Sequence, residues 1–422
     1  MCVLYIVDKN QIRQIVYDHQ KLFGLLNYKI KRDIDISSYL NSNQIIVITG
    51  IRRSGKSTLL KAFEESISKK IVYLKFDDIR LADFSDIQKL EEVVFEEFGT
   101  DIYFAFDEIQ ELTNWQKWVN GLHARNYKVF VTGSNAKLLS SELATYLTGR
   151  HKKITLYPLS FAEIIRYNNI SLINTSTEEK GALLALFKDY FENGGFPDVY
   201  LTKDFSLLSS YVEDIMLKDI VQRHNIKQKK ELVELLTYLL SNSGKLYSYR
   251  SLKQITNISS FSTIKNYLEA ICETYLLFSL AKYDSSLKKQ YVSSSKMYVI
   301  DPGLLQHVAF RVSENSGRIL ENIVCIQLKR LEKELYYHKD KHECDFVIKE
   351  GLKITQAIQV CYDLHSDNKK REIDGLLEAC QTHNLKQGLL LTYDQEEDFI
   401  QDNVKIQVKP VWKWLLEGIS SK

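Results

Sequence analysis

The chain has 422 residues, of which 45% are hydrophobic and 26% are charged, and its formal net charge is +2. This composition is ordinary for a globular protein and excludes a disordered or fibrous chain. No apolar run approaches the ~20 residues of a membrane-spanning helix, and the six cysteines form no CxxC pair. We therefore expect a cytoplasmic protein of roughly two to four domains, with reduced thiols and no membrane partner.

The first chemical motif is a loop between a predicted strand and a predicted helix. Residues 43–50, NQIIVITG, form a short apolar run typical of a buried parallel strand, and residues 56–67, KSTLLKAFEESI, have apolar side chains at helical spacing. The segment between them, GIRRSGKS, matches the GxxxxGK[ST] pattern, whose glycines let backbone N–H groups face phosphate oxygens at a helix N-terminus. We expect nucleotide binding by Gly50, Ile51, Arg52, Arg53, Ser54, Gly55, Lys56, Ser57 and Thr58.

Within this loop, we expect Lys56 to reach the β- and γ-phosphates and the Ser57 hydroxyl to ligate Mg²⁺. Residues 101–112, DIYFAFDEIQEL, form a second apolar strand that ends in two adjacent acids. Asp107 at this strand end is the candidate for the Mg²⁺ shell, and Glu108 is the candidate that polarises the attacking water. The sequence therefore predicts ATP and Mg²⁺ as the ligands.

Two further site candidates follow in the chain. The strand KVFVTGSN, residues 128–135, ends in small polar residues, so Ser134 or Asn135 is a candidate sensor of the γ-phosphate, with an ordinary polar turn as the alternative. Arg150 is a candidate for stabilising transition-state charge, in cis or across a subunit boundary, with a surface arginine as the alternative. The loop pattern does not require Arg52 and Arg53, and their role stays open.

The predicted strands of this region alternate with helical stretches. Such alternation indicates a doubly wound parallel α/β sheet, with the ligand at the carboxyl ends of the strands. The predicted strands are 44–49, 71–76, 102–106, 129–133 and 153–157.

Several segments resemble one protein family. ITGIRRSGKSTLL, FAFDEIQELTNWQKWV, VFVTGSNAKLL and LTGRHKKITLYPLSFAEI are similar, in this order, to prokaryotic AAA-type ATPases with a C-terminal restriction-endonuclease-like domain of uncharacterised function. YFENGGFPDVY (190–200) and YVEDIMLKDIVQRHNI (211–226) extend the resemblance, so that it covers nearly the whole chain. It implies a P-loop NTPase fold and a homo-oligomer. It also implies roles in ATP binding and hydrolysis for Lys56, Ser57, Asp107 and Glu108, and sensor and finger positions for Ser134 and Arg150.

The middle of the chain is predicted to be helical. A break at Gly194, Gly195 and Pro197 separates two helices, and three more helices are expected at 229–241, 249–256 and 261–274, with Ser248 and Ser260 as N-caps. A β-hairpin follows, and helix–helix–helix–hairpin is the winged-helix order.

Residues 244–300 of this module hold eight Lys and Arg against three acids. This local excess makes double-stranded DNA a candidate partner, and a protein–protein module is the alternative.

The last region resembles restriction-endonuclease-like nucleases, which hold a divalent metal with a helix Glu, a strand Asp and a strand Glu or Gln, followed two residues later by a lysine. Glu321, Asp345 and Gln359 match these positions, but the lysine position holds Cys361. A thiol cannot supply a cationic donor to a developing phosphorane. A degenerate fold kept for binding or assembly is therefore favoured over a working nuclease that uses Lys349 or Lys353 instead.

These features predict four domains. They are a P-loop AAA-type ATPase domain (1–160), a helical joint (161–228), a winged-helix domain (229–305) and a small α/β restriction-endonuclease-like domain (306–422). The predicted function is ATP binding and hydrolysis coupled to the C-terminal region, and one hypothesis is that the protein acts on DNA. The alternatives are a nucleotide-gated scaffold with slow hydrolysis and an ATP-controlled DNA nuclease.

Overall fold

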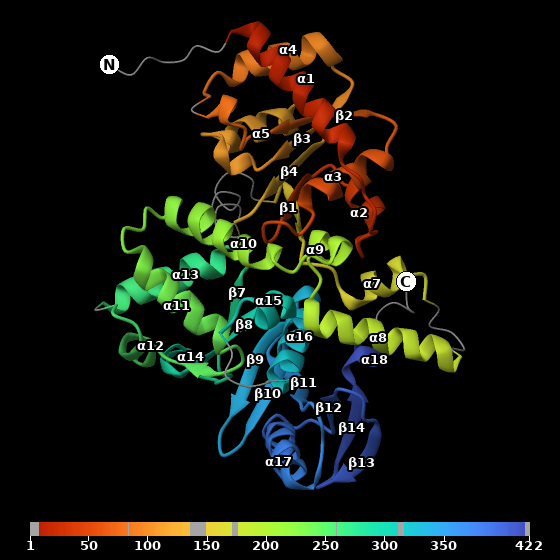
Figure 1. Ribbon diagram of the computed structural model, residues 1–422, viewed down its shortest axis with the longest axis vertical. Helices are drawn as coiled ribbons and strands as arrows, with labels where there is room; N and C mark the ends of the chain where they lie inside the picture. The colour runs from red at the N-terminus through yellow and green to blue at the C-terminus, as the bar shows by residue number, and fades with distance from the viewer. Residues whose placement is uncertain are drawn as a thin grey trace. The chain divides into compact units, whose positions relative to one another are not determined.

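The computed structural model describes residues 8–82, 84–135, 149–170, 176–258, 260–310 and 316–417. The chain divides into two compact units, Met1–Leu156 and Tyr157–Lys422 (Figure 1). The division falls four residues before the predicted boundary at residue 160. The finer boundaries predicted at 228 and 305 lie inside the second unit, where they stay predictions.

The first unit contains a five-stranded parallel sheet in the order β2-β3-β4-β1-β5. All five strands lie within three residues of their predicted ranges, and β1 to β4 are short runs rich in apolar residues. β5, with the sequence HKKIT, contains a single apolar residue, Ile154. The strands are β1 (Ile45–Thr49), β2 (Lys70–Lys75), β3 (Ile102–Asp107), β4 (Val129–Gly133) and β5 (His151–Thr155).

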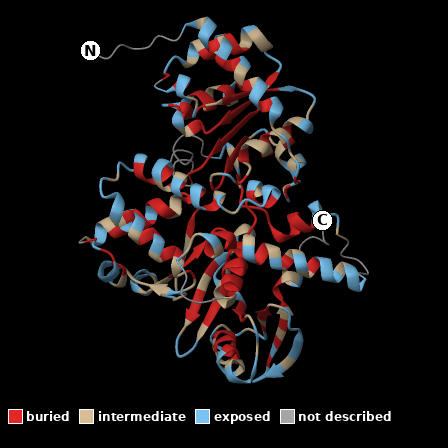
Figure 2. Cartoon of the chain, in the orientation of Figure 1, coloured by how far each residue is buried: buried red, intermediate tan, exposed pale blue. Residues whose placement is uncertain are grey.

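Helices cover both faces of this sheet, and the central strands are buried (Figure 2). Alternate residues along β1 enter different cores: Val47 packs with side chains of α1, α4 and α5, whereas Ile46 and Ile48 pack with α3. This is the doubly wound arrangement that the sequence predicts. The helical elements are α1 (Lys9–Leu25), α2 (Ile36–Leu40), α3 (Lys56–Glu65), η1 (Ile79–Leu81), α4 (Ile87–Phe98), η2 (Ile109–Glu111) and α5 (Trp115–Ala124).

The second unit begins with helices, as predicted for the joint. The expected break at Gly194 and Gly195 lies between α8 and α9, and Gly194 has a φ of 75°. A Cβ on Gly195 would lie 2.2 Å from the carbonyl oxygen of Leu159, so the close approach requires glycine. The elements are α7 (Phe161–Tyr167), α8 (Thr177–Asn193), α9 (Pro197–Thr202), α10 (Leu207–Asp214) and the π-helix η3 (Ile215–Gln222).

Five helices and a small antiparallel sheet in the order β6-β8-β7 come next. The first three helices agree with their predicted ranges, and the Ser248 side chain caps α12 by accepting a hydrogen bond from Ser251 N. Ser260 occupies the N-cap position of α13 without a side-chain cap bond. The elements are α11 (Lys229–Ser241), β6 (Leu246–Tyr247), α12 (Tyr249–Ile255), α13 (Phe261–Glu273), β7 (Leu277–Leu280), α14 (Leu287–Val292), β8 (Ser295–Val299) and α15 (Pro302–His307).

A six-stranded mixed sheet in the order β13-β14-β12-β11-β10-β9 completes the second unit. Strands β9 to β11 form an antiparallel meander, and β12 and β14 continue the sheet in parallel to β11. The elements are α16 (Ser316–Arg330), β9 (Glu334–Lys339), β10 (Glu343–Glu350), β11 (Lys353–Val360), α17 (Ser366–Thr382), β12 (Gln387–Thr392), β13 (Glu397–Gln401), β14 (Val404–Pro410) and α18 (Val411–Leu416). Among the described residues, no helix has the length and apolar character that a membrane crossing needs.

Candidate functional site

The loop between β1 and α3 has the backbone shape that its glycines predict. Gly50, Arg53 and Gly55 have φ values of 142°, 68° and 93°. A Cβ on Gly50 would lie 2.0 Å from the carbonyl oxygen of Leu156, so only glycine fits there. Helix α3 begins immediately after Gly55, and its N-terminal N–H groups therefore face the loop.

Lys56 is buried at the base of this loop. Its Nζ donates to the carbonyl oxygens of Gly50 and Ile51, at 3.2 Å each, and lies 3.9 Å from Oε1 of Glu108. Ser54 Oγ is buried and has no hydrogen-bond partner in the described part of the chain. A buried hydroxyl without a partner is costly, and a phosphate oxygen in the loop would satisfy it.

Asp107, at the end of β3, joins the loop to the sheet. Its Oδ2 accepts hydrogen bonds from the Ser57 hydroxyl at 2.7 Å and from the Tyr73 hydroxyl at 2.6 Å, and its Oδ1 accepts from the Thr132 hydroxyl. Burial raises the pKa of Asp107, and the negative charge of Glu108 raises it further. A divalent cation would offset both effects, so the paired Ser57 and Asp107 side chains fit Mg²⁺.

Glu108 follows Asp107 in a left-handed backbone conformation, with φ of 49°. Its N–H donates to Thr132 Oγ1 at 3.0 Å, and its Oε2 accepts from Gln110 Nε2 at 2.5 Å. The conformation keeps the Glu108 carboxylate near the ammonium of Lys56, at the same edge of the sheet as the loop. The four residues with predicted roles at the phosphates and the metal thus lie together: Lys56, Ser57, Asp107 and Glu108.

Ser134 and Asn135 are both buried and follow β4, whose last residue, Gly133, pairs with Thr49 at the end of β1. They therefore lie at the loop edge of the sheet, as a sensor requires.

Arg150 lies elsewhere, because it precedes β5 and its carbonyl oxygen accepts from Ile45 N, at the other end of β1. The five residues of β1 separate it from the loop by about 16 Å. Its Nη1 donates to Asn120 Oδ1 at 2.6 Å. Of the two alternatives for Arg150, this position does not favour action in cis.

Tyr73 and Thr132 are site residues that sequence analysis missed. Each is an ordinary strand residue in the sequence, and only the parallel pairing of β2, β3 and β4 brings both hydroxyls to Asp107. Among the loop arginines, Arg53 is exposed and Arg52 is half-buried.

Comparison with known proteins agrees with this geometry. Residues 42–165 match the model of an AAA domain, and residues 184–315 match a domain of unknown function. The chain is 36% identical to an uncharacterized protein of Methanocaldococcus jannaschii over 410 residues, which cover 92% of this chain and 91% of the relative. It is 31% identical over 397 residues to an uncharacterized protein of Haemophilus influenzae, covering 90% of this chain and 96% of the relative.

The chain belongs to the family of these two proteins. Its first unit carries the AAA-type P-loop domain of the family, and the loop described above lies within the matched range.

The second unit of this AAA-domain protein brings together Glu321 on α16 and Asp345 on β10, two of the three predicted nuclease-like positions. The buried ammonium of Lys296 lies 2.9 Å from Glu321 Oε1 and 2.9 Å from Asp345 Oδ1. The predicted substitute lysines are not at this cluster: Lys349 Nζ pairs with Glu334 Oε1 at 2.8 Å, and Lys353 is exposed at the start of β11.

A second group in this AAA-domain protein places His338, Asp340 and Glu378 close enough to share a cation. Glu378 already has a structural role, however, because its Oε1 accepts from the backbone N–H groups of Lys341 and His342. The His338 Nε2 lies 3.3 Å from the same oxygen. These contacts explain why the three side chains lie together: Glu378 stabilises the turn between β9 and β10.

Proposed function

We propose that this protein binds ATP with Mg²⁺ and hydrolyses it in its AAA domain. The observation that carries the proposal is the 2.7 Å hydrogen bond between Ser57 Oγ and Asp107 Oδ2, which joins the phosphate loop to the acid at the end of β3. Serine and aspartate in this pairing are the two side chains that a P-loop domain uses to hold magnesium.

Each residue has a distinct role in this proposal. The loop N–H groups and Lys56 bind the β- and γ-phosphates, and Lys56 is already held over the loop by the carbonyl oxygens of Gly50 and Ile51. Ser57 and Asp107 would hold Mg²⁺, which would supply positive charge to offset that of the phosphates. Glu108 accepts a proton from water, and Ser134 or Asn135 senses the terminal phosphate.

Arg150 is exposed at the edge of the sheet opposite its own loop, so it serves a nucleotide only in a neighbouring copy of the chain. A homo-oligomer with Arg150 in trans is part of the proposal. In such an assembly, nucleotide state is coupled to the second unit of each chain.

A nucleotide-gated scaffold with slow hydrolysis is the second candidate. It is supported by the contacts of Glu108, whose Oε1 lies 3.9 Å from the Lys56 ammonium and whose Oε2 accepts from Gln110. These two contacts hold the carboxylate in place, and the oxygen that accepts a proton from water has to turn away from its present partner.

Turnover of ATP by the wild-type protein and by Glu108→Gln tests the hydrolytic proposal. We expect the variant to bind ATP but to hydrolyse it at least about 100-fold more slowly, since it loses the general base. The matched control is Glu65→Gln, at the exposed end of α3. Equal rates for wild type and Glu108→Gln would contradict hydrolysis and leave the scaffold.

Calorimetry with Lys56→Ala tests nucleotide binding itself. We expect ATP affinity to fall at least about tenfold, because the charge on the phosphates loses its cationic partner. Lys117→Ala, an exposed lysine on α5, is the control. Unchanged affinity in Lys56→Ala would contradict both candidates.

We further propose double-stranded DNA as a client of the second unit. Six of the eight basic residues counted in residues 244–300 are exposed: Lys245, Arg250, Lys253, Lys265, Lys288 and Lys289. Lys296, counted with them in the sequence, is buried and cannot contact phosphate.

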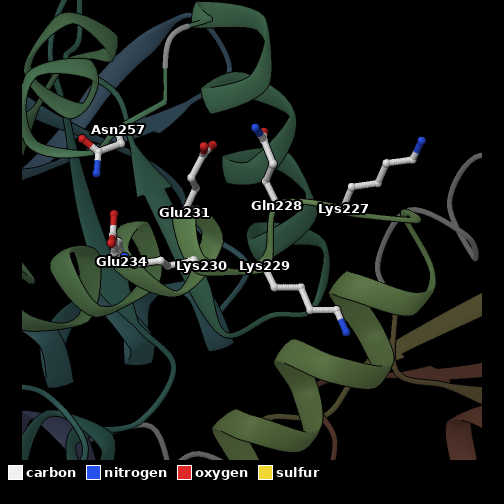
Figure 3. Close-up of a pocket in the computed structure, with 7 residues that line it drawn as sticks. All are labelled: Lys227, Gln228, Lys229, Lys230, Glu231, Glu234 and Asn257. Atoms are coloured by element: carbon white, nitrogen blue, oxygen red, sulfur yellow. The ribbon is translucent and has the colours of Figure 1, made fainter.

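A hollow at the start of α11 adds Lys227, Lys229 and Lys230, but Figure 3 shows the Lys227 and Lys229 side chains extending in different directions. Glu231 and Glu234 line the same hollow, so the three lysines leave it only a small positive excess, which fits an extended phosphate backbone better than one small ligand.

ATPase rates measured with and without duplex DNA test this client. We expect stimulation that falls as salt rises, because phosphate contacts release counterions. An Arg250→Ala/Lys253→Ala variant is expected to lose the stimulation and keep the basal rate. A rate that does not respond to DNA would favour a protein client.

A further inference from the structure

The second unit contains a lysine whose ammonium is enclosed by carboxylates. Lys296, on β8, has a side chain that is 2% exposed. Its Nζ lies 2.9 Å from Glu321 Oε1, 2.8 Å from Glu343 Oε1 and 2.9 Å from Asp345 Oδ1. An ammonium has three N–H donors, so these three carboxylates use all of its hydrogen bonds.

The surroundings of Lys296 favour the charged form of its side chain over the neutral form. Burial by itself lowers the pKa of Lys296, but the charges of Asp345 and Glu321 outweigh it and raise the pKa well above its usual value. Truncating one partner of such a buried group leaves the other charges uncompensated, so the cluster is expected to persist as a unit.

Gln359, the third nuclease-like position, does not face a shared cation. Its Oε1 accepts from Asp345 N at 3.1 Å, and its Nε2 donates to Glu372 Oε2 at 2.7 Å. The remaining oxygen of Asp345, Oδ2, accepts from Val360 N at 3.0 Å. The side chains that would complete a metal shell are therefore engaged with one another and with the backbone.

We propose that the Lys296 ammonium takes the place of the divalent cation that a nuclease-like fold implies. A cation that bridges a helix Glu and a strand Asp must lie in contact with both carboxylates, and this ammonium already does. A second cation at the same position would overlap with the ammonium group and would be repelled by its positive charge. The residues present thus do not fit a resident metal, and the second unit binds or assembles without cutting by metal catalysis.

The same contact joins two sheets of the second unit. Lys296 and Tyr298 lie on the same face of β8, and the Tyr298 hydroxyl donates to Glu321 Oε1 at 2.6 Å. Next to Glu321, Asn322 accepts from Val299 N and donates to Val299 O, both at 2.8 Å. The internal cation therefore anchors the β6-β8-β7 sheet to α16 and to the six-stranded sheet.

Manganese binding to the full-length protein, measured from the free Mn²⁺ signal in electron paramagnetic resonance without nucleotide, tests the proposal. Wild type and Asp345→Asn are expected to bind Mn²⁺ identically, since any weak site in the first unit is common to both. Tighter binding by wild type than by Asp345→Asn would show a metal site at Asp345 and overturn the proposal.

Removing the lysine is expected to create the site. Lys296→Met leaves three carboxylates together, so this variant should gain one Mn²⁺ per chain, at least about tenfold tighter than any wild-type binding, and Lys296→Met/Asp345→Asn should lose it. Lys203→Met, an exposed lysine paired with Asp189 at 2.8 Å, is the control that should gain nothing.

A folded Lys296→Met protein that gains no Mn²⁺ would contradict the proposal. If this variant does not fold alone, the wild-type and Asp345→Asn comparison still decides it. Plasmid nicking in Mn²⁺ by wild type that disappears in Asp345→Asn would also overturn it.

Discussion

At the residue scale, Asp107 shows how the site tolerates a buried carboxylate. Three hydroxyl groups, those of Ser57, Tyr73 and Thr132, donate to its two oxygens. Each donor lies on a different element, so the carboxylate depends on α3, β2 and β4 at once. Tyr73 is itself buried, and its hydroxyl donates to Asp107.

Tyr73→Phe tests this dependence. Loss of the hydroxyl leaves Asp107 with one donor fewer, and we expect unfolding free energy to decrease by about 1–3 kcal/mol and ATP turnover to fall. Urea unfolding and steady-state ATPase rates measure the two effects. Tyr103→Phe, on the neighbouring strand β3, is the control, and equal effects of both substitutions would contradict a specific role for Tyr73.

At the element scale, α17 packs closely on the six-stranded sheet through a glycine. A Cβ on Gly375 would lie 2.1 Å from the carbonyl oxygen of Glu343 on β10. A backbone carbonyl cannot move away as a flexible side chain can. The close packing of α17 on β10 therefore requires a residue without a Cβ at position 375. Gly181, in the interior of α8, is the opposite case, because a Cβ there would meet no atom within 4 Å.

Gly375→Ala and Gly181→Ala therefore form a matched pair. We expect Gly375→Ala to destabilise the second unit by about 1–3 kcal/mol, because it overpacks a core contact. Gly181→Ala is expected to stabilise it by about 0.5–1 kcal/mol, because alanine favours a helix interior. Thermal and urea unfolding measure both, and the same sign for the two variants would contradict this account of packing.

At the scale of the whole molecule, the second unit is held together by segments far apart in the chain. The Asp301 carboxylate accepts from Gly195 N at 2.7 Å and from Gly303 N at 2.9 Å, which ties the α8–α9 break to the start of α15. Burial raises the pKa of Asp301 to about 7, although its two N–H donors and Arg330 oppose the shift.

This raised pKa predicts a pH dependence of stability. The folded chain retains the proton up to about pH 7, whereas the unfolded chain releases it near 3.8. The contribution is thus fully present below pH 3.8 and is lost as pH rises through about 7, by up to about 4 kcal/mol.

Asp301→Asn removes this titration. We expect the variant to lose stability less steeply than wild type between about pH 4 and pH 7, because its side chain cannot ionise. Urea unfolding at several pH values measures the slope. A slope as steep as that of wild type would show that another group carries the dependence.

Much of this architecture was present in the sequence alone. Strand and helix ranges follow from the period of apolar residues, which is a local property, and the glycine spacing of residues 50–55 determines a loop that a nucleotide phosphate fits. For the same reason the sequence pointed to Lys56 and Ser57, which belong to the loop pattern, and to Asp107 and Glu108, which lie at the end of a strand. The positions of Glu321 and Asp345 were likewise visible from their order in the chain.

Only the tertiary structure decided which distant side chains meet. The order of strands placed Tyr73 and Thr132 at Asp107 and moved Arg150 to the far edge of the sheet. The less favoured alternative of a working nuclease named Lys349 or Lys353 as the substitute lysine, but the packing of β8 against α16 brought Lys296 to the carboxylates. Sequence periodicity shows whether a residue faces a core, whereas the partner of a buried charge depends on which elements pack together, and that is a non-local property of the folded chain.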